Sequence, residues 1–201
     1  MTERPIIFSA PMVKAILDGR KTQTRRIVKL TDSGRVKEVG SPKNWHLDDP
    51  DAIKACPYGV PGDRLWVREA WSYDPPDELW AKDRARLLYR EGYDHPPEMN
   101  DDEWPRWKSP IHCPRWASRI TLEIVDVRVE RVQEISEEDA IAEGIERVTG
   151  NSFRVYERGA EGETAPGAIS SYRSLWDSIN GKRAPWESNP YVWAITFKRV
   201  P

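Results

Sequence analysis

The densest group of chemically reactive side chains lies in one octapeptide close to the amino end. Residues 19–26 read GRKTQTRR. Lysine and arginine bind phosphate, and threonine hydroxyls hydrogen-bond a base or act as nucleophiles. The octapeptide therefore predicts either a lip that binds an anion or a nucleotide, or a solvated turn followed by an edge strand. On the first interpretation the binding side chains are Arg20, Thr22, Arg25 and Arg26.

A family resemblance, given below with the motifs that carry it, implies Lys21, Thr24 and Glu143 as the candidates for catalysis. A threonine hydroxyl is a poor nucleophile until a base removes its proton. Lys21 serves as that base only if burial and neighbouring arginines lower its pKa from about 10.4 toward 7–8. Glu143 precedes Gly144 at the expected end of a helix, where the helix dipole disfavours an anion. Its carboxylate is therefore either solvated or paired with a cation.

For Lys21 to act on Thr24, both side chains must also point to the same side of the backbone. Lys21 and Thr24 have opposite parity, so an ideal strand would point them to opposite faces. They converge only if Lys21 lies in a turn before the strand, and Gly19 suits such a turn because glycine readily adopts positive φ. We therefore expect a turn before a strand that covers residues 22–28.

Metal-dependent and serine-hydrolase chemistry find little support in the sequence. A Cys2His2 zinc site needs closely spaced pairs such as C-x2-C or H-x3-H, and neither spacing occurs. There is no G-x-S-x-G motif, and the glycines between 150 and 167 lack the strand–turn–helix context of a phosphate loop. We expect no metal, no cofactor and ordinary loop or core thiols. The residues considered as ligands are His46, Cys56, His112 and Cys113.

Hydrophobic periodicity predicts the elements that hold these residues. The first half contains a strand over 6–8, a helix over 11–17 with Ser9 as its N-cap, an irregular connection over 31–60 and a half-buried strand over 64–69.

The second half contains the strongest expected strand, over residues 119–132. Its buried phase changes at Ile124 and Val125, which indicates a bulge. Ser136 caps a helix that runs to Gly144, with Asp139 in a weak form of the capping box. A helix with an apolar face over 169–179 and a final strand over 191–199 follow. This order favours an α+β protein, a small mixed β-barrel with two or three packed helices.

Residues 72–110 differ in composition from the rest of the chain. They contain six prolines, and residues 74–108 hold ten acidic against six basic side chains. Such a stretch is typical of a loop insertion on the surface of a domain, here a single domain over 1–201. Residues 78–89 could form a helix within it.

Composition excludes several classes of protein. The chain has 201 residues, a net charge of −2 and two cysteines, too few for a disulfide scaffold. No apolar run approaches the ~20 residues that span a bilayer, and the amino end does not resemble a signal peptide. We therefore expect a cytoplasmic protein with no membrane partner. Residues 1–30 nevertheless carry a net charge of +5, which favours a phosphate-bearing ligand.

Ten tryptophans are an unusual number and must enter a core, a binding surface or both. Those in or beside expected elements should be mostly core: Trp66, Trp71, Trp116, Trp176 and Trp193. Those in loops either stack on bases or fasten the loops to the domain: Trp45, Trp80, Trp104, Trp107 and Trp186.

The octapeptide and several later segments together resemble the ASCH domain superfamily, in particular ASCH-domain proteins of phages and prophages. The first motif is Gly19-Arg20-Lys21-Thr22-x-Thr24-x-Arg26. The later segments are Pro61-Gly62-Asp63-x-Leu65-Trp66-Val67, the strand over 119–132, Ala142-Glu143-Gly144-Ile145 and Trp193-x-Ile195-x-Phe197. The resemblance covers nearly the whole chain except the insertion over 72–110.

The resemblance implies a PUA-like β-barrel and a role in RNA binding or RNA metabolism. One bacterial branch of the superfamily consists of amidohydrolases that deacetylate N4-acetylcytidine with a lysine, a threonine and a helix glutamate. These match Lys21, Thr24 and Glu143 here. Many members carry glutamate at the position of Thr24, so the threonine favours the hydrolase branch. This chain is much larger than those compact enzymes, and its long loops would reshape or cover the pocket.

We therefore expect a domain that binds a pyrimidine nucleoside or RNA and hydrolyses an amide on a modified base. Thr24 would be the nucleophile, Lys21 the base and Glu143 a supporting acid or base. One alternative is a non-catalytic module that binds RNA or a modified base. Another is a ribonuclease in which Lys21 and nearby arginines stabilise a phosphoryl transition state. A third is a phage accessory factor that binds a protein through the acidic insertion.

Overall fold

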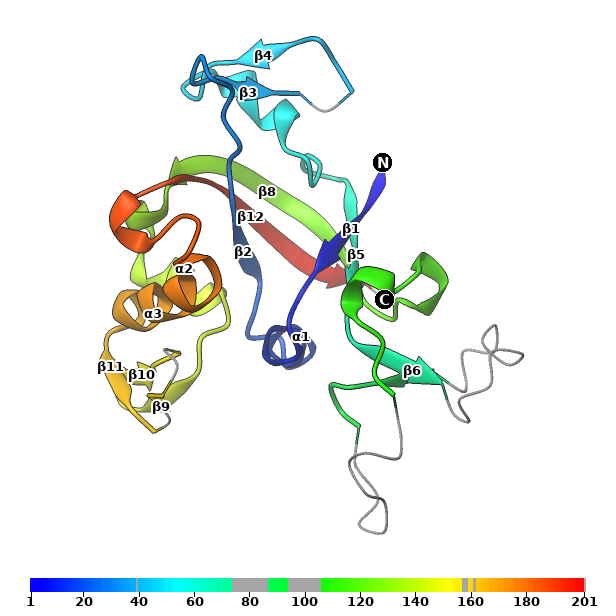
Figure 1. The fold of residues 1–201 in the computed structure, drawn as a ribbon, viewed down its shortest axis with the longest axis vertical. Helices are drawn as coiled ribbons and strands as arrows, with labels where there is room; N and C mark the ends of the chain where they lie inside the picture. Colours follow the sequence, from blue (N-terminus) through cyan, green and yellow to red (C-terminus); the bar gives the residue numbers. More distant parts are fainter. Residues whose placement is uncertain (39, 74–86, 94–105, 157–158, 161, 201) are drawn as a thin grey trace.

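The structure is a computed structural model, and it describes residues 1–38, 40–73, 87–93, 106–156, 159–160 and 162–200. Its main element is a five-stranded mixed sheet in the order β1-β5-β8-β12-β2 (Figure 1). The strands are β1 (Glu3–Ile7), β5 (Arg64–Arg68), β8 (Thr121–Arg131), β12 (Tyr191–Val200) and β2 (Gln23–Ile27). Only the β1–β5 pair is parallel. The expected α+β class is confirmed.

The long β8–β12 ladder forms the centre of this sheet. Thr196 pairs with Asp126 while Phe197 pairs with Ile124, so Val125 is the extra residue of a bulge. Val125 is 49% exposed, whereas Ile124 is buried. The predicted bulge is confirmed, and it lets the buried face of β8 change phase without breaking the ladder.

The expected closed barrel is not present among the described strands. β1 and β2 are the two edges of the sheet. The guanidinium of Arg26 on β2 donates to the carbonyl of Ile7 on β1 at 2.7 Å, and it stacks 5.2 Å from the ring centre of Phe8. A side chain therefore links the edges where a barrel would have a backbone ladder.

Helix α1 (Ala10–Leu17) connects these two edge strands. After it, Gly19 has φ +74°, and the N–H groups of Arg20 and Lys21 both donate to the carbonyl of Ala15. Lys21 consequently lies in a turn before β2 begins at Gln23. The predicted turn is confirmed, and with it the condition for Lys21 and Thr24 to approach one site.

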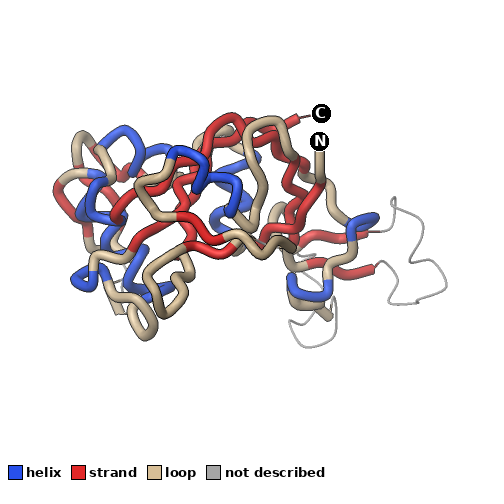
Figure 2. The backbone as a smooth tube through the Cα atoms, turned by 90° about the horizontal axis from the view of Figure 1, so that it is seen from above, coloured by secondary structure: helices blue, strands red, loops and turns tan. Residues whose placement is uncertain are grey.

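Helices α2 (Glu137–Ala142) and α3 (Ala168–Asn180) pack with a small sheet of β9 (Arg147–Thr149), β10 (Ser152–Arg154) and β11 (Thr164–Pro166). They lie on one side of the molecule, and the strand pair of β6 (Trp71–Tyr73) and β7 (Leu87–Tyr89) lies on the opposite side (Figures 1 and 2). The hydroxyl of Ser136 accepts from the N–H of Asp139, which confirms the predicted cap of α2.

Three expectations about individual segments are corrected. The connection over 31–60 contains β3 (Val36–Lys37), β4 (Asn44–Trp45) and the 3-10 helix η1 (Pro50–Ala55), because its apolar residues join the main core. Trp66 is buried, so β5 is covered on both faces. In the insertion, β6 (Trp71–Tyr73) pairs with β7 (Leu87–Tyr89), so a helix extending to residue 89 is wrong at 87–89. Residues 78–86 lie outside the described residues.

Four of the five tryptophans expected in the core are buried: Trp66, Trp71, Trp176 and Trp193. The fifth, Trp116, is 37% exposed. It lies in a short 3-10 helix and meets Trp71 edge-on. Among the loop tryptophans, Trp186 is buried against α3. Two of the loop tryptophans, Trp80 and Trp104, lie outside the described residues.

The remaining 3-10 helices are η4 (Pro110–His112), η5 (Arg115–Ala117), η6 (Val132–Glu134) and η7 (Trp186–Ser188). In the part of the chain that the structure describes, no helix has the length and apolar character needed to cross a bilayer.

Candidate functional site

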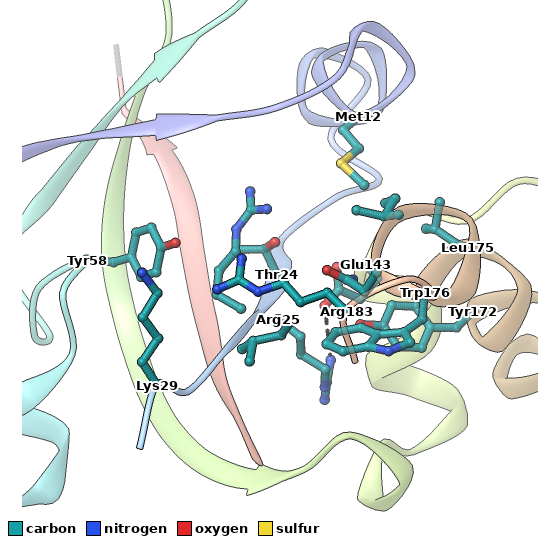
Figure 3. Close-up of a pocket in the computed structure, with 14 residues that line it drawn as sticks. Met12, Thr24, Arg25, Lys29, Tyr58, Glu143, Tyr172, Leu175, Trp176 and Arg183 are labelled. Atoms are coloured by element: carbon teal, nitrogen blue, oxygen red, sulfur yellow. Dashed lines mark hydrogen bonds and ion pairs between the residues drawn. The ribbon is translucent and has the colours of Figure 1, made fainter. Parts of the chain in front are cut away.

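A cavity of about 320 Å³ opens between β2, α1 and α3 (Figure 3). Thr24, Arg25, Arg26 and Ile27 line it from β2, and Glu143 lines it from the end of α2. Its other lining residues are Met12, Lys29, Tyr58, Tyr172, Leu175, Trp176, Ile179, Asn180 and Arg183. The volume is at the small end of the ~300–1,000 Å³ range of small-molecule sites. One nucleoside-sized ligand therefore suits it better than a folded polymer.

Glu143 is held by a buried lysine from the opposite side of the cavity wall. The ammonium of Lys21 donates to Oε2 of Glu143 at 2.7 Å, to the carbonyl of Glu143 at 2.7 Å and to the carbonyl of Gln23 at 2.8 Å. Both side chains are almost fully buried, with 0% and 3% exposed. The three N–H bonds of the ammonium are thus all used, and one of its partners is a helix-end carbonyl, which favours a cation.

The close approach of Lys21 depends on Gly144. Gly144 has φ +85°, and a Cβ there would lie 2.7 Å from the Cβ of Lys21 and 2.9 Å from the Cβ of Ala15. The Glu143-Gly144 pair therefore both ends α2 and makes room for the lysine.

Arg25 forms the second cationic contact of Glu143. Its guanidinium donates to Oε1 of Glu143 at 3.3 Å, to Glu130 at 2.8 Å and to Asp139 at 2.8 Å. It also donates to Oε1 of Gln23 at 2.6 Å, and its side chain is 0% exposed. The donors of Arg25 are thus occupied inside the protein, although its side chain also lines the cavity, and its binding of a phosphate stays a prediction.

We call this group the wall network: Lys21, Arg25, Arg128, Glu130, Asp139 and Glu143. Arg128 completes it by donating to Asp139 at 2.7 Å and to Glu130 at 3.4 Å. Buried charges require such pairing because desolvation of an unpaired ion is costly.

The network and the burial around it shift several pKa values. Burial lowers the pKa of Lys21 from its ordinary value, although the charge and hydrogen bond of Glu143 oppose that shift. Burial works to raise the pKa of Asp139, but hydrogen bonds from Arg25 and Gln23 outweigh it and hold this pKa low. Burial, together with the charge of Glu143, raises the pKa of Tyr172 well above its usual range.

The structure brings some predicted site residues together and separates others. Thr24 and Glu143 line the same cavity (Figure 3). Lys21 does not line it and reaches it only through Glu143. Thr22 is exposed, outside the cavity, and its N–H donates to the carbonyl of Ala142. Arg20 donates to Gly144 and Asp18 at the surface. Arg20 and Thr22 therefore do not line the cavity that Arg26 lines, and their binding of a ligand stays a prediction.

Several residues of the site were not identified from the sequence. Asp139 was expected only as part of a helix cap, and the apolar face of α3 was expected only as core. Their roles depend on contacts across more than a hundred residues, such as Gln23 with Asp139 at 3.0 Å. The missed residues are Tyr58, Lys29, Gln23, Glu130, Asp139, Tyr172, Asn180 and Arg183.

A larger cavity of about 970 Å³ lies on the other side of Glu143. It shares Met12, Glu143, Leu175 and Ile179 with the first cavity, so these residues form the partition between the two. Arg20 lines this second cavity, together with Phe153, Tyr156 and other side chains of the small sheet.

Both cysteines are buried free thiols, as expected. Within the described ranges, no group of three or more His, Cys, Asp or Glu side chains is arranged to hold a metal ion. Comparison of the chain with protein-family models, with curated proteins and with solved structures finds no match.

Proposed function

We propose that this protein binds a pyrimidine nucleoside in the smaller cavity and hydrolyses an acyl amide on its base. One observation carries the proposal: Thr24 and Glu143 line one cavity, and Glu143 is hydrogen-bonded to the buried ammonium of Lys21. These are the three residues that the ASCH resemblance selects, although Lys21 and Glu143 lie 122 residues apart in the chain.

The same proposal covers the fold. We propose a PUA-like architecture in which the junction of β1 and β2 is closed by the Arg26 side chain. The order of the strands, the turn that carries Lys21 and the position of Glu143 after the long strand support this assignment.

In the proposed reaction, the hydroxyl of Thr24 attacks the acyl carbonyl carbon while Glu143 accepts the hydroxyl proton. The C–N bond then breaks, and Glu143 returns the proton to the leaving amine. Water hydrolyses the resulting ester on Thr24, which releases the carboxylic acid. Lys21 is a positioning residue in this scheme, because all three of its N–H bonds hold Glu143 and Gln23 rather than the cavity.

The test is release of cytidine from N4-acetylcytidine by the purified protein. We expect Glu143→Gln to lower kcat by about 10²–10⁴-fold, the usual contribution of general acid–base catalysis, and Thr24→Ala, which removes the nucleophile, to lower it further. Thr149→Ala and Glu138→Gln are matched controls, because both residues are exposed and lie outside the two cavities. Absence of turnover by the wild type, or undiminished turnover by Thr24→Ala, would falsify the hydrolase.

One observation favours a second candidate, a non-catalytic module that binds the modified base. Lys21 has its N–H bonds occupied and does not line the cavity, so it is not placed to take a proton from Thr24 directly. The module would bind N4-acetylcytidine, measured by calorimetry, and leave it intact.

A further inference from the structure

The cations that line the smaller cavity or lie directly behind its wall fall into two sets. The positive charges of Lys21 and Arg25 are matched by Glu143, Glu130 and Asp139. Arg26, Lys29 and Arg183 also line the cavity, and no described residue forms an ion pair with any of them. We call these three side chains the cationic rim. Positive charges that line one cavity repel one another and together attract an anion from solution.

A second observation at the rim concerns Arg26. Its Nη2 donates to the carbonyl of Ile7, and its Nε is buried without a hydrogen-bond partner among the described residues. The ring of Phe8 lies 5.2 Å from the guanidinium carbon and fixes this side chain at the cavity lining. A bound anion would therefore meet the fixed positive charge of the guanidinium, because the buried Nε is not open to the cavity.

The rim occupies a different part of the cavity from the proposed reacting groups. Arg183 extends from beyond α3 across the opening toward the side where Lys29 and Tyr58 lie, while Glu143 lies toward α3 (Figure 3). Lys29 and Arg183 are exposed, whereas Thr24 and Glu143 are buried. A ligand that reaches both parts has an inner end that meets a hydroxyl and a carboxylate and an outer end that meets cations.

We propose that the cationic rim is a phosphate subsite, so that the ligand of this cavity is a nucleotide rather than a free nucleoside. The identity of the base rests on the proposed function, but the phosphate rests on the rim alone. Arginine and lysine are the side chains that proteins use for phosphate oxygens. The phosphate belongs either to a free mononucleotide or to a phosphodiester in a strand, and the chemistry of the subsite is the same for both.

The test compares ligands with and without the phosphate. Calorimetry on the wild-type protein measures cytidine, cytidine 5′-monophosphate, cytidine 3′-monophosphate and the dinucleotide CpC. We expect at least one phosphorylated ligand to bind about tenfold or more tightly than cytidine, the gain typical of one charge-assisted contact. A best ligand among the monophosphates indicates a free nucleotide, and a best ligand in CpC indicates a strand. Equal binding of all four, or no binding, overturns the phosphate subsite.

Variants locate the effect at the rim. Lys29→Gln and Arg183→Gln should each reduce affinity for the best phosphorylated ligand by about 3–10-fold and reduce cytidine affinity by a smaller factor. Lys37→Gln and Lys182→Gln are the controls, since both lysines are exposed close by in the sequence and do not line the cavity. Equal losses in the control variants would show general charge attraction and overturn the subsite.

The hydrolase and the subsite fail separately. Tight phosphate-dependent binding without turnover contradicts the hydrolase and supports the subsite. Turnover of N4-acetylcytidine and its 5′- and 3′-monophosphates with equal kcat/KM, together with equal binding, supports the hydrolase and overturns the subsite.

Discussion

The wall network and the cationic rim meet at the same cavity, which Arg25 and Glu143 line from the wall network, but their cations differ in whether a carboxylate pairs with them. In the wall, Lys21 and Arg25 are 0% exposed and each contacts a carboxylate. At the rim, Lys29 and Arg183 are exposed and have no acidic partner among the described residues. Burial explains the difference, because a buried charge must be paired inside the protein while water can solvate an exposed one. Arg25 and Arg26 are neighbours on β2 and both line the cavity, but the charge of Arg25 is paired inside the protein, whereas Arg26 forms no ion pair with a described residue.

The largest expected effect comes from exchanging these two neighbours for glutamine. Arg25→Gln leaves Glu130, Asp139 and Glu143 without their shared cation. We expect it to lower the free energy of unfolding by about 5 kcal/mol, at the upper end for a broken buried pair. Arg26→Gln loses one hydrogen bond and one stacking contact, about 2 kcal/mol in total. Urea unfolding measures both, and equal losses would contradict the division into wall and rim.

Lys21→Met should lower the free energy of unfolding by about 3 kcal/mol, because Glu143 loses one buried partner but keeps Arg25. Lys14→Met is the matched control. Lys14 pairs with Asp18 at the surface at 3.5 Å, and such pairs contribute about 0–1 kcal/mol. A loss below ~1 kcal/mol for Lys21→Met would mean that the buried pair is not held as the structure describes.

Gly144→Ala tests whether Lys21 of the wall network can be buried only when residue 144 has no Cβ. The substitution places a Cβ against those of Lys21 and Ala15 at φ +85°, so we expect a loss of about 2 kcal/mol or more. Gly150→Ala has φ +51° and meets no atom within 4 Å, so only the backbone cost of about 1 kcal/mol applies. Thermal unfolding of the two variants gives the comparison. Equal shifts in Tm would show that the lysine does not need this space.

The smallest expected effect is on the free energy of unfolding at acid pH. The pKa of Asp139 is held below its ordinary value in the folded protein, so the unfolded chain binds its proton first as pH falls. The stability from this group is present above about pH 4 and is lost as the pH falls through the folded-state pKa. Because the carboxylate is partly solvated, we expect about 1 kcal/mol or less. Asp139→Asn should flatten the acid slope of stability, and exposed Asp48→Asn should not.

Local sequence patterns predicted those structural features that depend on only a few consecutive residues. The turn at Gly19, the cap at Ser136 and the bulge at Val125 each depend on backbone preferences or on side-chain alternation within a few residues. The helix over 78–89 failed at 87–89, because there strand pairing with Trp71–Tyr73 decides the structure. The expected barrel failed because closure depends on whether distant edge strands meet, which local periodicity does not report.

The sequence by itself determined the basic character of the first thirty residues and the turn that allows Lys21 and Thr24 to face the same way, and its resemblance to ASCH domains selected the candidates Lys21, Thr24 and Glu143. Only the tertiary structure decided which of these charges are paired. It placed Lys21 behind Glu143, enclosed Arg25 among three carboxylates and left Arg26 at the cavity with Lys29 and Arg183. The reason is that residue type sets what a side chain can bind, whereas desolvation and long-range pairing set whether it is still available to bind a ligand.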